Sequence, residues 1–498
     1  MVRRSAALLS AVVAWCAIGP GCGAPGPVAP REPIDVVLIT LDTTRADRLG
    51  CYGNDRIATP HLDRLARDGV LFENAFTPVP STLPSHASIM TGLYPARHGV
   101  HDNGVYRLDP GLATLAARFD EAGYATAAFI SAFVLDAQFG LDLGFDLYDD
   151  RVDAPLVRVD PSVIAASEAH TDDEKRWLVQ QTLPFQRRAE SVTRAAVEWL
   201  RGRADEPLFL WVHYFDPHMD YTAPAPWASR YDADYDGALD GTREAFVAAS
   251  QRGGWRSPAD IPPDEFAHMV ALYDGEVSYM DHWIGELLDA LRRRERWNDT
   301  LVLVIGDHGE GFGEHGQVWE HAGNLFDETI RVPFLLALPG GRHAGTRVRA
   351  LARTIDVAPT VLDEAGLPPL DLAAGVSLVP LLVGAPGARR PEEILLETGR
   401  ERQALASEIS RLGVRSSSFK LVFDLAPGDE VVGVGLYDLA HDPAETVSVV
   451  DGQPDLTRRW TGLVFDSYRA MHAESGDRSW RGPDDVTNEA LRSLGYVN

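Results

Sequence analysis

The chain has 498 residues, which is too long for one small core and predicts one large domain with a smaller partner. Hydrophobic residues make up 45% of it, so a substantial core is expected and wholesale disorder is excluded. The 46 Lys and Arg against 73 Asp and Glu give a formal net charge of -27. Such a surface repels nucleic acids and anionic membranes, so an anionic substrate would need a local positive group, for which a metal ion is the obvious choice.

The first 31 residues have the pattern of a targeting segment followed by a linker. Two arginines precede an apolar run over residues 6–18, which is shorter than a membrane-spanning helix, and small residues and prolines follow. This pattern predicts a signal peptide and an exported protein, whether periplasmic, attached to the outer membrane or extracellular. The residues before Cys22 match a lipoprotein cleavage box only in part, so a lipid anchor at Cys22 stays open. No later stretch is apolar enough to predict a transmembrane anchor.

Two apolar runs predict strands buried on both faces, as in a parallel sheet. Residues 34–41 (IDVVLITL) lead to Asp42, and residues 301–305 (LVLVI) lead to Gly306-Asp307-His308. Helices are predicted between these strands. One starts at Thr59-Pro60, and another is indicated by the helical spacing of apolar residues from about Val277. This order predicts an α/β fold with a large doubly wound mixed or parallel sheet flanked by helices. Because ligands bind beyond the carboxyl ends of such strands, Asp42 and Asp307-His308 are expected to share one site.

A change in composition divides the remainder of the chain. Residues 384–390 (GAPGARR) are typical of a loop, and short apolar runs at 395–398, 419–423 and 431–437 predict strands. We therefore expect a main domain over residues 32–385 and a small α+β domain over 386–498. The stretches 151–174 and 221–263 are expected to be loops that determine substrate specificity.

An ordered set of short motifs carries the strongest signal in the sequence. Residues 40–53 read TLDTTRADRLGCYG and residues 80–92 read PSTLPSHASIMTG. Further along come LYPARHGV (93–100), DPH (216–218), SYMD (278–281), DHGE (307–310), RVP (331–333), YDL (437–439) and LGY (494–496). In this order the motifs resemble the sulfatase family, within the alkaline-phosphatase-like group, across nearly the whole mature chain. The resemblance implies a metal-dependent ester hydrolase.

The resemblance also assigns a metal site and a nucleophile. The implied metal ligands are Asp42, Thr43, Thr82, Asp307 and His308. Thr82 stands where the family carries the Cys or Ser that becomes formylglycine, so formylglycine is not expected and the Thr82 hydroxyl is interpreted as the metal-activated nucleophile. One divalent ion is implied, calcium by resemblance, with zinc or manganese open because His308 adds a nitrogen. A second ion would need further ligands, for which Asp216 and His218 are the available residues.

Five further residues are assigned to catalysis or substrate binding. His218 is expected to protonate the leaving group or to clamp substrate oxygens, and His321 lies near the position of the family's substrate-binding Lys. Asn103 is expected to donate a hydrogen bond to the bound oxyanion. His86 replaces the family's supporting Arg, and Ser131 lies where the family carries a sulfate-binding Lys and a His. Structural roles alone are assigned to three other histidines, His213, His282 and His441.

Three functions remain open at the level of sequence. The first is hydrolysis of sulfate esters or phosphate (di)esters, and the second is Thr-dependent phosphotransfer to an envelope lipid or glycan, as in phosphoethanolamine transferases. The third is a non-catalytic glycan-binding homologue, against which the retained Asp42, Thr82, Asp307 and His308 argue. A phosphorylated Thr can be cleaved by water, whereas a sulfated Thr would release its sulfate slowly, so the chemistry favours phosphate. The expected partner is an anionic sulfate or phosphate ester, and a glycan that carries such an ester is one candidate. A nucleic acid is not expected as a partner.

Overall fold

The computed structural model describes residues 32–475, except residues 105, 153, 156–183, 204, 385–390, 399–409 and 427–429. The predicted signal peptide with Cys22, most of the predicted loop at 151–174, the boundary at 385/386 and the LGY motif lie outside the described residues. The chain from Pro33 onward belongs to one compact unit. Within the part of the chain that the structure describes, no helix is both long and apolar enough to cross a membrane.

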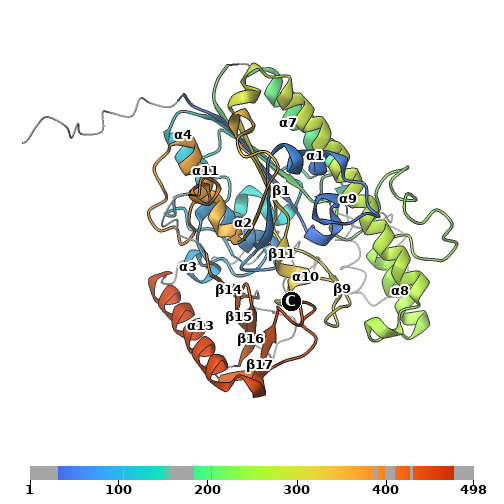
Figure 1. The fold of residues 1–498 in the computed structure, drawn as a ribbon. Helices are drawn as coiled ribbons and strands as arrows, with labels where there is room; N and C mark the ends of the chain where they lie inside the picture. The colour runs from blue at the N-terminus through green and yellow to red at the C-terminus, as the bar shows by residue number, and fades with distance from the viewer. Residues whose placement is uncertain are drawn as a thin grey trace, which may run out of the picture. The chain divides into compact units, whose positions relative to one another are not determined.

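A nine-stranded mixed sheet forms the centre of the main domain, in the order β11-β2-β12-β8-β1-β7-β3-β4 with β13 beside β2 (Figure 1). Its strands are β1 (Asp35–Leu41), β2 (Val70–Phe76), β3 (Ala125–Phe129), β4 (Leu147–Asp149), β7 (Leu208–Tyr214), β8 (Thr300–Gly306), β11 (Arg331–Val332), β12 (Phe334–Ala337) and β13 (Thr346–Arg353). Strands β8, β1, β7 and β3 run parallel, and β12 is antiparallel to both of its neighbours. The predicted mixed sheet is confirmed.

Both faces of the sheet are covered by helices, which explains the continuous apolar runs of β1 and β8. Every residue of these two strands is buried. One face packs against α1 (Pro60–Asp68), α7 (Ala189–Arg201) and α9 (Pro263–Arg292). The other face packs against α2 (Thr82–Thr91), α4 (Leu115–Glu121) and α11 (Val357–Ala365) (Figure 1).

Two helices differ from the sequence expectations. The helix predicted from Val277 begins 14 residues earlier, at Pro263, because buried residues such as Met269 and Tyr273 extend its apolar stripe. The stretch 221–263, expected to be a loop, contains α8 (Arg243–Gly253), whose Thr242 caps the amide of Ala245 at 3.1 Å. Ala249 is the one buried residue of α8, so the sequence carries no apolar stripe to signal it. The remaining short elements are α3 (Pro95–His98), α10 (Asp327–Ile330), α12 (Val379–Leu382), β5 (Ala154–Pro155), β6 (Pro184–Gln186), β9 (Gly311–Phe312) and β10 (Val318–Glu320).

A second, antiparallel sheet of four strands follows, and it is the expected small α+β domain. It consists of β14 (Glu393–Glu397), β15 (Ser410–Ser416), β16 (Phe419–Ala426) and β17 (Glu430–Asp438), in that order. Helix α13 (Pro454–Ser475) packs against it through Trp460 and Val464. Strand β15 was not predicted, because its sequence SRLGVRS contains few apolar residues. Its Leu412 and Val414 are nevertheless buried in the core of this sheet.

A buried group of charges fixes this small sheet to the main domain. Lys420 on β16 is fully buried, and its Nζ lies 2.6 Å from both Asp327 and Glu445 and donates to the carbonyl of Leu325 at 3.0 Å. Arg415 on β15 makes a two-point contact with Asp327 at 2.9 and 2.8 Å. Burial alone would raise the pKa of Asp327, but Arg415 and Lys420 outweigh it and hold the pKa below its ordinary value.

Replacing the buried cation tests this connection. We expect Lys420→Met to lower the free energy of unfolding by about 3 to 5 kcal/mol, because it leaves the buried Glu445 without its cation and Asp327 with Arg415 alone. Arg458→Met is the control, since its pair with Asp455 is exposed and is worth less than about 1 kcal/mol. Because the folded-state pKa of Asp327 is lowered, its contribution is present above its ordinary value of 3.8 and is lost as the pH falls. Urea unfolding at pH 7 and at acid pH measures both effects, and equal losses in the two variants would contradict this assignment.

Candidate active site

The carboxyl ends of neighbouring parallel strands bring the expected ligands together. Asp42 follows β1, and Asp307 follows β8, which pairs with β1. Hydrogen bonds continue past the strand ends: the amide of Asp42 donates to Tyr214 at 2.9 Å, and that of Asp307 donates to Leu41 at 3.1 Å. The two aspartates therefore lie side by side, as their positions at strand ends led us to expect.

Asp42, Asp307 and His308 form a group that could hold a metal ion, with ligand atoms all within 4.8 Å of one another. The Nε2 atom of His308 lies 3.7 Å from Asp42 Oδ1 and 3.5 Å from Asp307 Oδ2. Its Nδ1 donates a hydrogen bond to the carbonyl of Gly309 at 3.0 Å, which leaves Nε2 with its lone pair directed at the carboxylates. We refer to these three residues as the ligand group.

The carboxylates of the ligand group are buried without compensation. Both oxygens of Asp42 and Oδ2 of Asp307 accept no hydrogen bond from any described residue. Burial raises the pKa of both groups, and the charge of Asp42 raises that of Asp307 further. A divalent cation would remove this penalty, so these residues fit a metal ion. A second possible group, His86 with His213 and Asp307, fits less well because both ring nitrogens of His86 are already engaged.

Thr82 begins helix α2 and lies at the ligand group. Its Oγ1 is 3.2 Å from Nε2 of His308. The start of the helix is held in place by the amide of Leu83, which donates to Asn103 Oδ1 at 2.8 Å, and by the Ser85 hydroxyl, which donates to the carbonyl of Asp307 at 2.8 Å. The structure thus brings the expected nucleophile to the expected ligands. The expected contact of Asn103 with an oxyanion stays a prediction.

His86 supports the backbone at Thr82. Because a carbonyl can only accept, His86 Nδ1 carries the proton and donates to the carbonyl of Thr82 at 2.8 Å. Its Nε2 then accepts from the hydroxyl of Thr40 at 3.0 Å, and Thr40 in turn accepts from Trp211 at 2.9 Å. Burial lowers the pKa of His86 to about 3, so the ring is neutral. Its role in substrate binding stays a prediction, since both of its nitrogens serve the fold here.

Ser131 and His213, which lies on β7, are in contact with each other. The hydroxyl of Ser131 donates to the carbonyl of His213 at 2.6 Å, so its substrate contact also stays a prediction. His213, to which the sequence analysis gave a structural role alone, has Nε2 3.4 Å from Asp42 Oδ2. Neither of its ring nitrogens has a hydrogen-bond partner among the described residues. The pairing of His213 with Thr40 of β1 arises only in the folded sheet, so the sequence carried no signal for its place beside Asp42.

The two histidines expected to be catalytic border the ligand group. His218 donates from Nδ1 to Met219 at 2.8 Å, its ring stacks on Phe215, and burial lowers its pKa to about 4. Its Nε2 is then unprotonated in the free protein, and its role toward the leaving group or the substrate oxygens stays a prediction. The ring of His321 lies 4.3 Å from that of His308 and 5.4 Å from that of His218. Burial would lower the pKa of His321, but Glu310 raises it above its ordinary value.

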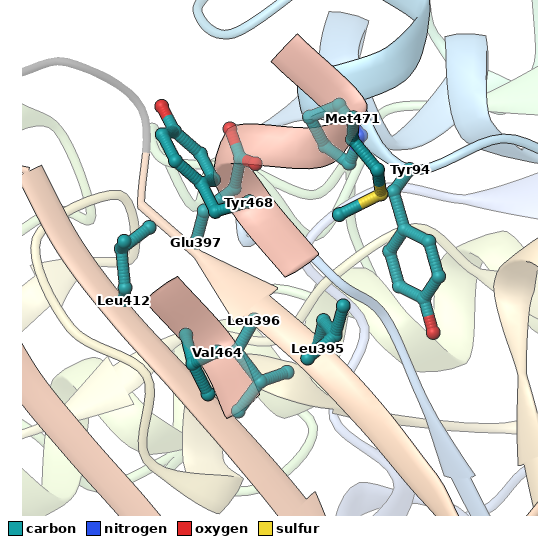
Figure 2. Close-up of a pocket in the computed structure, with 9 residues that line it drawn as sticks. Tyr94, Leu395, Leu396, Glu397, Leu412, Val464, Tyr468 and Met471 are labelled. Atoms are coloured by element: carbon teal, nitrogen blue, oxygen red, sulfur yellow. The ribbon is translucent and has the colours of Figure 1, made fainter. Parts of the chain in front are cut away.

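Asp216 is not part of the ligand group, and neither are the residues that line the pocket of Figure 2. Asp216 accepts from the amide of Ala189 at 3.0 Å, and the groups of described residues that could hold a metal do not include it. The expected use of Asp216 as a second metal ligand thus finds no support. The pocket lies between β14 and α13 and contains none of the predicted site residues (Figure 2). It is lined by Tyr94, Pro95, Leu395, Leu396, Glu397, Leu412, Val464, Tyr468 and Met471.

A strained turn joins the ligand group to helix α9. Thr43 has φ 45°, a left-handed conformation that a β-branched residue adopts only at a cost. The fully buried hydroxyl of Tyr273 donates to the carbonyl of Thr43 at 2.8 Å and accepts from the amide of Arg45 at 3.1 Å. This clamp holds the turn immediately after Asp42. The Thr43 hydroxyl, an expected ligand, is buried without a hydrogen-bond partner among the described residues, so its role stays a prediction.

Removing the clamp tests whether the turn orients the ligands. We expect Tyr273→Phe to lower the affinity for a divalent ion by about 10-fold, as is typical when a residue behind a ligand is lost. Tyr52→Phe is the control, because its hydroxyl also donates to a backbone carbonyl, that of Phe72 at 2.9 Å, away from the ligand group. Titration calorimetry with zinc and manganese measures the affinity. Unchanged binding in Tyr273→Phe, or an equal loss in both variants, would contradict the clamp.

Adding a metal ion at two pH values tests whether a cation offsets the buried charges of Asp42 and Asp307. In the metal-free protein the raised pKa values of Asp42 and Asp307 mean that their ionisation destabilises the fold as the pH rises. A bound cation reverses this, so we expect the rise in the unfolding midpoint on metal addition to be larger at pH 8 than at pH 5. At an ion concentration of 100 times Kd the gain in free energy should be about 2.7 kcal/mol. Asp307→Asn should remove most of it, and a gain independent of pH would speak against these ligands.

The sequence matches known proteins along most of its length. The model of the family described as Sulfatase matches residues 34–367, and that described as N-sulphoglucosamine sulphohydrolase, C-terminal, matches residues 313–458. A choline-sulfatase of Rhizobium meliloti is 27% identical over 93% of this chain and 92% of its own length. The multifunctional alkaline phosphatase superfamily protein PehA of Trinickia caryophylli is 28% identical over 72% of this chain and 79% of its own.

The fold is also that of solved relatives. The phosphonate monoester hydrolase of Agrobacterium radiobacter superposes with a TM-score of 0.66, at 24% identity, over 89% of this chain and 96% of its own. At that identity the likeness concerns the fold alone, whereas the Sulfatase match spans more than half of the sequence and includes Asp42, Thr82 and Asp307-His308. The chain therefore belongs to the sulfatase family of ester hydrolases.

Proposed function

We propose that this chain hydrolyses anionic phosphate (di)esters or sulfate esters, phosphoesters being favoured, with Thr82 as the nucleophile. The observation that carries the proposal is the position of the Thr82 hydroxyl, 3.2 Å from His308 Nε2 at the start of α2 and beside two uncompensated carboxylates. The names of the relatives cover both ester classes, a choline-sulfatase and a phosphonate monoester hydrolase.

We further propose that the ligand group, together with the Thr82 hydroxyl, holds one divalent ion. When bound, the ion would polarise an ester oxygen and lower the pKa of the hydroxyl. The mixed set of carboxylates, a hydroxyl and one imidazole nitrogen favours zinc or manganese, because calcium prefers oxygen ligands. Calcium binding with equal or higher affinity would contradict this choice.

Each step of the reaction is assigned to particular side chains. Thr82 Oγ1 forms a bond to phosphorus while the bond to the leaving oxygen breaks, and water later cleaves the phosphothreonine to regenerate the hydroxyl. His86 fixes the Thr82 backbone, and the amide of Asn103 donates to an oxygen of the reacting group. His218 and His321, whose rings lie beside that of His308, contact substrate oxygens. Release of sulfate from a sulfated threonine would be slow, which is why phosphoesters are favoured.

Two alternatives differ in what happens at this site. A phosphotransferase would use the same Thr82 but pass the phosphoryl group to an alcohol in place of water. A glycan-binding protein would keep the ligand group without turnover, but it has no evident need for a hydroxyl placed against His308. Export, inferred from residues 1–31, would expose the protein to envelope or extracellular esters in either case.

A substrate panel with matched variants separates these functions. We expect the metal-loaded protein to cleave 4-nitrophenyl phosphodiesters and phosphonate esters faster than 4-nitrophenyl sulfate. Thr82→Ala should reduce kcat by a factor of about 1,000 or more, whereas Thr82→Ser keeps the hydroxyl and should retain most activity. His441→Ala is the control, because its side chain is exposed and lies in the turn after β17. Dominant sulfate cleavage that depends on Thr82 would overturn the preference for phosphoesters, and full activity in Thr82→Ala would overturn the nucleophile.

A further inference from the structure

Two chain segments beside the active site are locked together at Arg243, the first residue of α8. The amide of Tyr221 donates to the carbonyl of Gly241 at 2.9 Å, and the amide of Arg243 donates to Asp220 Oδ1 at 2.7 Å. Gly241 has φ 89°, and a Cβ there would lie 2.0 Å from the carbonyl oxygen of Tyr221, so only glycine permits this approach. The position of Arg243 relative to the His218 segment is therefore fixed by the backbone.

The side chain of Arg243 reaches the other histidine segment. Its Nη1 lies 3.1 Å from Oε1 of Glu320, the last residue of β10 and the neighbour of His321. In Figure 1, α8 lies beside β9, the strand that pairs with β10. The charge of Arg243 also acts on His218, whose pKa it lowers in addition to the larger effect of burial. Arg243 thus links the two segments that carry His218 and His321, through its backbone amide on the first and its guanidinium on the second.

The ion pair between Arg243 and Glu320 is weak. The side chains of Arg243 and Glu320 are 45% and 51% exposed, so their ion pair is worth less than about 1 kcal/mol. A guanidinium in that position can exchange a surface carboxylate for the oxyanion of a ligand at little cost, and it binds carboxylate, phosphate or sulfate in a two-point contact. Arg45, by comparison, is buried and holds Asp47 and Glu314.

A second anionic group on a substrate would need a cation that the described residues around the ligand group do not supply. Residues 130–133 read ISAF and contain no cation, and Ser131 is engaged with the backbone of β7. One divalent ion neutralises Asp42 and Asp307 but adds no positive charge beyond them. A substrate with a second negative charge therefore needs another cation, and Arg243 pairs with Glu320, the neighbour of His321, and acts electrostatically on His218.

We propose that Arg243 is a specificity-determining residue that binds a second anionic group of the substrate, carried on the part of the ester that leaves. The preferred substrate is then an ester whose leaving group bears a carboxylate, phosphate or sulfate. This proposal rests on the proposed ester hydrolysis, because it defines which substrates that same site selects.

Binding of non-hydrolysable probes tests the proposal without relying on turnover. The probes are phenylphosphonate and its 2-, 3- and 4-carboxyphenyl analogues, titrated into the metal-loaded full-length protein by calorimetry. We expect at least one carboxylated isomer to bind about 10-fold more tightly than phenylphosphonate, as a charge-assisted hydrogen bond provides. Arg243→Gln should abolish this ratio, and Arg243→Lys should reduce it because the two-point contact is lost.

Glu320→Gln distinguishes recognition from a structural role of the ion pair. It breaks the same pair but removes a competitor for Arg243, so the preference for the carboxylated isomer should persist or increase. If Arg243→Gln and Glu320→Gln weaken all probes alike, the pair is structural and the proposal is overturned. If phenylphosphonate binds but no isomer is preferred, only the role of Arg243 is overturned. If no probe binds to the metal-loaded protein, the ester site itself is refuted, and this proposal with it.

Discussion

Two buried carboxylates at the ends of adjacent strands, with a single hydrogen-bond donor between them in the described part of the chain, the amide of His308, are the constraint on which the rest of the site depends. Asp42 and Asp307 are fully buried, and three of their four oxygens have no hydrogen-bond partner among the described residues. Keeping such charges together costs several kcal/mol, which the surrounding packing must outweigh until a cation binds. The buried pairing of β1 with β8 and the strained turn at Thr43 persist because a large core fixes both.

The histidines of the site share one arrangement. His86, His308 and His218 each donate from Nδ1 to a backbone carbonyl, those of Thr82, Gly309 and Met219 respectively. This contact fixes the ring and sets the tautomer, while burial lowers the pKa and keeps each ring neutral. The difference lies in Nε2, which accepts from Thr40 in His86 but faces the ligand group in His308. The same backbone contact thus accompanies a supporting residue in one case and a candidate metal ligand in the other.

The small sheet contributes to the site at a distance. Lys420 and Arg415 bind Asp327, and Glu445 accepts from the amide of Asp327 at 2.8 Å. Asp327 begins α10, shortly after His321 and before β11 of the central sheet. The segment that carries His321 is therefore held from both domains by a fully buried lysine and its carboxylates.

The sequence by itself determined the class of fold, the buried strands at 34–41 and 301–305, and the placement of Asp42, Thr82 and Asp307-His308 at one site. These follow from apolar runs, strand-end positions and motif order, all of which are local or ordered along the chain. The tertiary structure alone decided what depends on neighbours distant in sequence. His213 joins the site because β7 pairs with β1, and the Tyr273 hydroxyl reaches Thr43 across 230 positions. Helix α8 and strand β15 escaped detection because packing and capping, more than an apolar pattern, stabilise them.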